Sequence, residues 1–190
     1  MRHYYDDVMS ALCFSQQDAK SAKKVAETLP EGRLKSAWSN GRYYLLPSFL
    51  KVLWKLQSLN TANSNEYAIV FRTFGDDIPD VAMEIECCIK GTHPLYLGKK
   101  LDSSFALLPP YATFHRTESV TTLRVGTLQT GIITETALEK NIERVIGYGA
   151  IHDRIMNMLL NKSTIALRDD WAWWNDHGEI GECGKVYIMK

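Results

Sequence analysis

The sequence predicts an α/β protein built on a sheet in which strands and helices alternate. The apolar segment 67–73 lies between two amphipathic helical segments, 47–59 and 79–90, an order typical of a βα-repeating sheet. A second apolar strand, 163–168, follows another helical segment. Both strands end in polar residues, and open α/β sheets bind ligands beyond the carboxyl ends of their strands.

Two helices are predicted ahead of the first strand. In 16–28 small apolar residues recur at helical spacing, and a proline and a glycine soon afterwards end the helix. The second helix begins at Pro47, because the fixed φ of proline suits the first helical position and its missing N–H is not needed there. Its apolar residues form one stripe through Leu59. An Asn-Gly pair at 40–41 predicts a turn between the two helices.

The remaining elements follow from weaker patterns. The helix 79–90 ends at Gly91, a typical residue after a helix. Prolines mark turns between 92 and 134, where 121–126 is predicted as a short edge strand. The segment 135–161 predicts a helix that glycines interrupt near its middle.

A short helix rich in tryptophan follows the second strand, and 184–190 predicts a last strand. No repeat, low-complexity segment or linker divides the chain. Residues 1–190 are therefore predicted to form one domain, and this length is sufficient to bury a core.

The composition excludes several classes of protein. With 22 basic and 22 acidic residues the formal net charge is zero, so the overall charge favours neither nucleic acid nor a membrane surface as a partner. No apolar run approaches the roughly 20 residues that cross a bilayer, and the N-terminus lacks the apolar region of a signal peptide. Four cysteines without a C-x-x-C pair predict buried free thiols in a reducing compartment. We therefore expect a cytoplasmic protein.

A phosphate site is predicted where the first strand ends. Thr73 offers a hydroxyl, and the amides of Phe74 and Gly75 follow it at the beginning of a helix. Such groups at the positive end of a helix dipole can bind one phosphate. The alternative is structural: a threonine that caps the next turn and a glycine that permits it.

A metal site is predicted where the second strand ends. Asp169 and Asp170 are adjacent, and a hard cation such as Mg²⁺ would relieve their mutual repulsion. Alternatively, the pair caps the helix that follows. Lys162, just before this strand, would reach a phosphate or neutralise the aspartates; otherwise it is an ordinary solvated lysine.

Other residues give weaker signals. His177 and Cys183 would need further ligands to form a zinc site. Arg72 and Arg168 flank the two strand ends, where they would either steer anions or occupy alternating polar positions. The tryptophans in 171–174 would either stack a base or a sugar or pack onto the sheet.

In their order and spacing these parts resemble the haloacid dehalogenase-like (HAD-like) superfamily of phosphatases and phosphotransferases. GRYYLLP and its helix resemble the segment before the second motif of that family, and AIVFRT, ending in Thr73, resembles the second motif itself. Lys162 lies where the third-motif lysine is expected, and IALRDD, ending in Asp169 and Asp170, resembles the fourth motif. The strings FRTFG and DDWAWW resemble an uncharacterised eukaryotic subgroup of the superfamily. The resemblance covers roughly residues 40–175.

This resemblance implies a three-layer, Rossmann-type α/β sandwich with a mainly parallel sheet. It also implies Mg²⁺-dependent phosphoryl chemistry on a phosphorylated small molecule or protein. In that case Thr73 and Lys162 would hold the phosphoryl group, while Asp169 and Asp170 would hold Mg²⁺. In the family, an aspartate on the first strand attacks phosphorus, and a second aspartate two residues later acts as general acid and base.

That first strand, which should end D-x-D-x-T/S, has no clear counterpart here. Asp6 and Asp7 lack the second aspartate and a proper strand, and Asp18 comes too late after the apolar segment 8–14. In the family the strand lies centrally, between the strands of the second and fourth motifs, so its loss would expose backbone groups and apolar surface. We therefore expect either that 8–14 fills the central position or that the chain is an incomplete product of a longer gene.

The sequence thus predicts a degenerate or truncated HAD-like domain with a residual phosphate and Mg²⁺ pocket and little hydrolytic activity. Two alternatives stay open. One is a non-catalytic protein-interaction domain that uses the same sheet and its tryptophan-rich face. The other is an active Mg²⁺-dependent phosphatase. The sequence predicts neither a substrate nor an oligomeric state.

Overall fold

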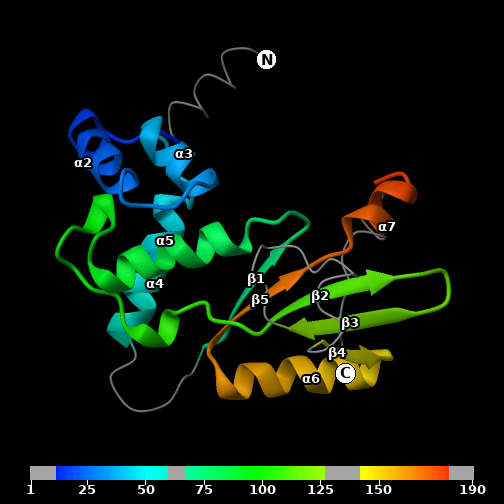
Figure 1. Ribbon diagram of the computed structural model, residues 1–190. Helices are drawn as coiled ribbons and strands as arrows, with labels where there is room; N and C mark the ends of the chain where they lie inside the picture. The colour runs from blue at the N-terminus through cyan, green and yellow to red at the C-terminus, as the bar shows by residue number, and fades with distance from the viewer. Residues whose placement is uncertain (1–11, 60–66, 127–141, 180–190) are drawn as a thin grey trace. The chain divides into compact units, whose positions relative to one another are not determined.

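The computed structural model, drawn as a ribbon in Figure 1, describes residues 12–59, 67–126 and 142–179. The chain divides into two compact units, which are residues 1–66 with 80–106 and residues 67–79 with 107–190. The predicted single domain over residues 1–190 stays a prediction, because a division into compact units does not show whether each unit folds independently.

The first unit is helical. Its elements are α2 (Gln16–Ala26), α3 (Arg33–Ser39), α4 (Pro47–Leu59), most of α5 (Ile78–Lys90) and the 3₁₀ turns η1 (Pro94–Tyr96) and η2 (Ser103–Phe105). Trp38 is fully buried and belongs to a core cluster with Leu34 and Cys87. The predicted helices that begin near 16, 47 and 79 are confirmed. The sequence did not predict α3, because its seven residues are too few to show a helical period.

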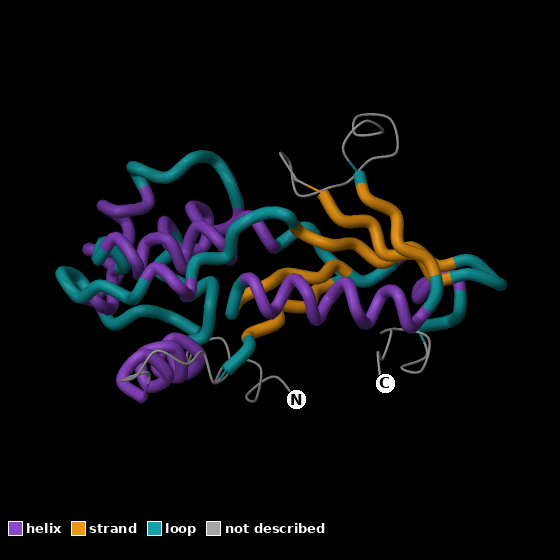
Figure 2. Tube along the Cα trace, turned by 90° about the horizontal axis from the view of Figure 1, so that it is seen from below, coloured by secondary structure: helices purple, strands orange, loops and turns teal. Residues whose placement is uncertain are grey.

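The second unit contains a five-stranded sheet in the order β1-β5-β2-β3-β4. Its strands are β1 (Ile69–Thr73), β2 (Tyr111–Arg116), β3 (Thr121–Gly126), β4 (Glu143–Ile146) and β5 (Thr164–Arg168). β1, β5 and β2 run parallel, whereas β3 and β4 join the sheet in antiparallel pairs. Figure 2 shows the strands of the sheet side by side, in orange. The protein is therefore α/β with a mixed sheet, and the prediction of a mainly parallel sheet is not confirmed.

One face of the sheet is covered by α6 (Tyr148–Asn161), which lies along the strands in both views (Figures 1 and 2). Ile151 and Ile155 of this helix share a buried core cluster with Phe114 and Leu123 of the sheet. After β5, the short helix α7 (Trp171–Asp176) follows.

Two predictions near α6 need correction. Residues 143–146 form strand β4, not helix. The helix begins only after Gly147, whose φ of 90° is one that glycine adopts readily and other residues rarely do. The segment 121–126 is a strand, as predicted, but an interior one, because β4 pairs with its outer side. The predicted last strand, 184–190, lies outside the described residues.

The expectation that 8–14 fills a central position in the sheet is wrong for its described part. β1 pairs directly with β5. In the helical unit the amide of Phe14 donates to the carbonyl of Gly41 (2.8 Å), and the amide of Tyr43 donates to the carbonyl of Leu12 (2.8 Å). This segment therefore pairs with the turn after α3.

Cys87 and Cys88 are buried free thiols, as predicted, and burial raises the pKa of the Cys88 thiol to about 12. Cys13 is exposed rather than buried, and Cys183 lies outside the described residues. In the part of the chain that the structure describes, no helix has the length and apolar character needed to cross a bilayer.

Candidate functional site

The carboxyl ends of β1 and β5 meet at one edge of the sheet. Their parallel register pairs Thr73 with Arg168, and the amide of Asp169 donates a hydrogen bond to the carbonyl of Thr73 (2.7 Å). Thr73, Asp169 and Asp170 therefore come together at this edge, as the sequence predicted. Each of their side chains already has protein partners.

Thr73 organises the turn after β1. Its Oγ1 accepts a hydrogen bond from the amide of Gly75 (2.9 Å) and donates one to Oδ2 of Asp77 (3.0 Å). A Cβ at position 75 would lie 2.5 Å from that same oxygen, so a larger residue there would force the side chain of Asp77 to move. The carboxylate of Asp77 adds a negative charge beside the hydroxyl, which disfavours a phosphate there. The ring of Phe74 stacks on that of Trp174, with centroids 4.8 Å apart. These contacts match the structural alternative, in which Thr73 caps the turn after β1 and Gly75 permits it.

Asp169 is buried, and Arg72 binds both of its carboxylate oxygens. Nε of Arg72 donates to Oδ2 (3.1 Å), and a second guanidinium nitrogen donates to Oδ1. The guanidinium also lies over the ring of Phe114, 5.6 Å from its centroid. Burying a carboxylate is costly unless it is both paired and hydrogen-bonded, and this two-pronged contact meets both needs. Arg72 thus holds β1 to the chain that follows β5.

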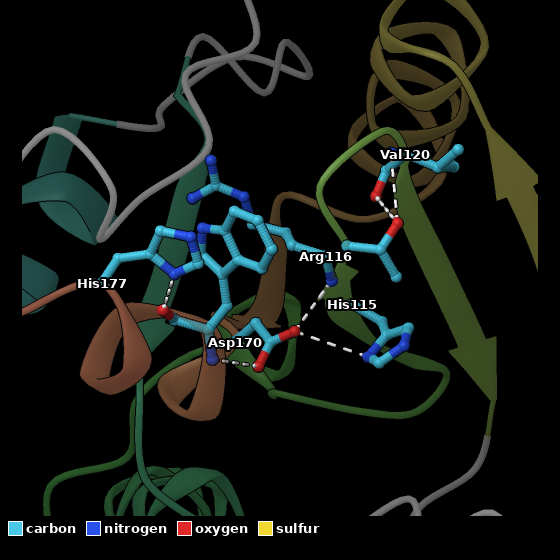
Figure 3. A network of polar contacts seen from close by, with 7 residues as sticks. His115, Arg116, Val120, Asp170 and His177 are labelled. Atoms are coloured by element: carbon cyan, nitrogen blue, oxygen red, sulfur yellow. Dashed lines mark hydrogen bonds and ion pairs between the residues drawn. The ribbon is translucent and has the colours of Figure 1, made fainter.

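Asp170 caps α7, which is the structural alternative that the sequence left open. Its Oδ1 accepts a hydrogen bond from the amide of Trp173 (3.1 Å), and its Oδ2 accepts one from the amide of Arg116 (2.8 Å). Nδ1 of His115 lies 3.4 Å from Oδ2. Figure 3 shows Asp170 between these groups. The side chain therefore links the beginning of α7 to the end of β2.

The two aspartates do not fit a Mg²⁺ site. Mg²⁺ requires oxygen ligands in nearly octahedral geometry, whereas both oxygens of Asp169 bind a guanidinium and those of Asp170 accept amide hydrogens. Within residues 12–59, 67–126 and 142–179, no group of three or more His, Cys, Asp or Glu side chains could hold a metal ion. Arg72 supplies Asp169 with the positive charge that a cation would supply.

Lys162 is not brought to these residues. It follows α6 directly, and its Nζ donates to the carbonyls of Leu108 (3.2 Å) and Pro109. Partial burial lowers the pKa of Lys162. Lys162 lies at the amino end of β5 and Asp169 at its carboxyl end, so the strand separates them by about 20 Å. Lys162 and Thr73 therefore lie at opposite ends of the paired strands β5 and β1.

An aromatic and cationic cluster lies beside Asp170 that the sequence did not reveal. The ring of His177 stacks on that of Trp173 (3.8 Å between centroids), and the guanidinium of Arg116 lies over Trp173, 5.3 Å from its centroid. These three residues are called the Trp173 cluster, and Figure 3 labels two of them, Arg116 and His177. The i, i+4 spacing of Trp173 and His177 was the available signal. Arg116 could not be placed, because β2 was not predicted.

The remaining candidates are the acids considered for the nucleophile and the predicted zinc pair. Asp18 lies in the first turn of α2, where its amide donates to Oγ of the capping residue Ser15 (3.2 Å), so it does not end a strand. Asp6, Asp7 and Cys183 lie outside the described residues. The predicted zinc pair of His177 and Cys183 therefore stays a prediction.

Comparisons with protein-family models, with curated proteins and with solved structures give no match to this chain. The fold and the site define a class only in physical terms. The protein is α/β with a mixed sheet, and of the two acids after β5 one pairs with an arginine and the other accepts hydrogen bonds from backbone amides. The functional argument therefore depends on these contacts.

Proposed function

We propose that the chain is a degenerate HAD-like domain that binds a protein partner and does not hydrolyse phosphate esters. The direct pairing of β1 with β5, from Ile69–Thr164 to Thr73–Arg168, carries this proposal. In the HAD-like superfamily the nucleophile strand lies between the strands of the second and fourth motifs. Because these two strands are hydrogen-bonded to each other here, no backbone position between them remains for a nucleophile.

The HAD-like assignment and its three-layer sandwich are parts of the same proposal. The parallel run β1-β5-β2 supports them, since it carries both resembling motifs at its carboxyl edge. The antiparallel strands β3 and β4 depart from the family pattern. The proposal includes neither Mg²⁺ nor a phosphate at Thr73, because Arg72 and Asp77 take those positions.

The tryptophan-rich face of α7 supports a protein partner. Trp171 is 50% exposed, and the neighbouring Trp173 cluster adds an arginine stacked on a second indole ring. Tryptophan and arginine are among the residues that contribute most binding energy at protein interfaces. A side chain of this size that stays exposed at the end of a sheet is therefore available to a partner.

A phosphatase assay tests the proposal. With p-nitrophenyl phosphate and Mg²⁺ we expect turnover equal to that of the buffer blank, and no change in the Thr73→Ala variant. Turnover above the blank that Thr73→Ala abolishes and Thr73→Ser retains would establish the active phosphatase instead. Added Mg²⁺ should also leave the melting temperature unchanged, because only a ligand that binds the folded state raises it.

A further inference from the structure

A row of arginines crosses the sheet. The register of the five strands places one residue of each strand side by side. From β1 to β4 these residues are Thr73, Arg168, Thr113, Arg124 and Arg144, which we call the arginine row. Neighbours in the row lie one strand spacing apart, about 5 Å.

The arginine row lies on the face of the sheet that α6 does not cover. Side chains alternate between the two faces along a strand. Leu167, Ala112 and Val125 each precede or follow a member of the row by one position, and they belong to the core cluster that contains α6 residues. The row therefore faces away from α6. Arg144 is exposed, and Arg124 and Arg168 are partly exposed.

The charged residues (Asp, Glu, Lys and Arg) that the strands themselves contribute to this face are all arginines. The only acidic residue in the five described strands is Glu143. Its register with Val125 places it on the α6 face, where it binds Arg154 of α6 (2.8 Å). On the opposite face, Arg124 and Arg144 lie directly opposite each other on adjacent strands. Arg168 lies two strands away from Arg124 on the same face, and positive charge gathered on one face attracts an anionic ligand.

We propose that the arginine row binds a small molecule that carries two phosphoryl groups. Guanidinium groups bind phosphate oxygens in pairs with matching geometry. One phosphoryl group would bind between Arg124 and Arg144, which are about 5 Å apart, and the second at Arg168, about 10 Å from Arg124. Thr113 lies between Arg168 and Arg124, and its short side chain lets the two guanidiniums converge above it.

The size of the row favours a small ligand. From Arg168 to Arg144 it spans three strand spacings, about 14 Å, and the formal net charge of the chain is zero. A nucleic-acid surface gains its affinity from many phosphate contacts and an excess of positive charge. The site also stands independently of the proposed function, since it does not depend on whether the chain hydrolyses its ligand.

Calorimetric titration of the whole chain with inorganic pyrophosphate tests this proposal. We expect saturable binding that weakens about tenfold or more in Arg144→Gln and in Arg168→Gln, because each substitution removes a charge-assisted hydrogen-bonding group. Arg154→Gln is the matched control, since it removes an arginine of the same unit from the other face. It should leave the affinity unchanged, and circular dichroism should show that all three variants fold.

Three results would overturn the proposal. The first is an absence of pyrophosphate binding by the unmodified chain. The second is binding that Arg144→Gln and Arg168→Gln leave unchanged. The third is a titration in which a single-stranded DNA oligonucleotide binds more tightly than pyrophosphate and loses affinity in the same two variants, since this would make the row a nucleic-acid surface.

Discussion

Among the described residues two carboxylates are buried, Asp169 in the sheet unit and Glu84 in the helical unit, and each is stabilised differently. Arg72 binds both oxygens of Asp169 through the two-pronged donor geometry of its guanidinium. Glu84 has weaker partners. Nε2 of His93 lies 3.1 Å from its Oε1, and the amide of Leu45 donates to its Oε2 (2.8 Å). Burial raises the pKa of Glu84, and the hydrogen bonds from His93 and Leu45 oppose that rise.

The comparison separates a structural acid from one that can respond to pH. The guanidinium supplies a positive charge and donates to both carboxylate oxygens, so the Asp169–Arg72 pair ties β1 to the end of β5. An imidazole and an amide give less compensation, so the protonation of Glu84 stays sensitive to its surroundings. The acid that resembles a metal ligand is therefore the one least free to act as one.

Removal of Arg72 should cause the largest loss of stability. Arg72→Ala leaves Asp169 buried without its cation, which should lower the free energy of unfolding by about 3 kcal/mol. Urea denaturation followed by tryptophan fluorescence measures this loss. The double variant Arg72→Met/Asp169→Leu should recover most of it, because an apolar pair of similar volume replaces a buried ion pair at little cost.

The effect of Mg²⁺ on the stability of the same variant tests whether Asp169 can bind a metal. If Asp169 is a structural acid, Mg²⁺ should stabilise neither the unmodified chain nor Arg72→Ala, because the site supplies too few oxygen ligands. A selective rise in the melting temperature of Arg72→Ala with Mg²⁺ would show that the cation and the guanidinium compete for one site. That result would show that Asp169 can act as a metal ligand.

Glu84 should give the next largest effect, as a dependence of stability on pH. Its pKa in the folded state is raised above the ordinary 4.5, so between these two pKa values the folded chain keeps a proton that the unfolded chain has lost. Stability from this group is therefore complete below 4.5 and is lost as pH rises through the folded-state pKa, by about 1.4 kcal/mol per pH unit within that interval.

Urea denaturation at a series of pH values checks this prediction. The stability of the unmodified chain should fall relative to that of Glu84→Gln as pH rises above 4.5, since glutamine does not titrate. Glu86→Gln is the matched control, because Glu86 lies on the same helix, is more than half exposed and pairs with Lys90. If stability depends on pH equally in Glu84→Gln and Glu86→Gln, then Glu84 is not the source of the dependence.

The sequence predicted those parts of the fold whose signal is local and repeated. α4 and α5 show a clear apolar stripe, and β1 and β5 are apolar runs that end in polar residues. β4 has only four residues, and Val145 alone packs against the core, so no alternation could show it. The order of the sheet depends on pairings between distant segments, which a local pattern does not contain.

The candidate site was predicted in position but not in chemistry. The meeting of Thr73 and Asp169 followed from two parallel strands that end at the same edge. The pairing of Arg72 with Asp169 depends on register and side-chain direction, which place an arginine opposite Leu167 on the core face of the sheet. A strand-end arginine looks the same in sequence whether it faces solvent or a buried acid.

Asp170 gives the smallest predicted effect and completes the comparison. It follows Asp169 directly, but its side chain is 11% exposed and its hydrogen-bond partners are two backbone amides rather than a guanidinium. Asp170→Ala removes the N-cap of α7 and should therefore cost about 1 kcal/mol in urea denaturation. Asp176→Ala, at the other end of the same helix, is the control and should cost less. A loss from Asp170→Ala as large as that from Arg72→Ala would mean that the two adjacent acids act as one unit, and the distinction between a paired acid and a capping acid would then fail.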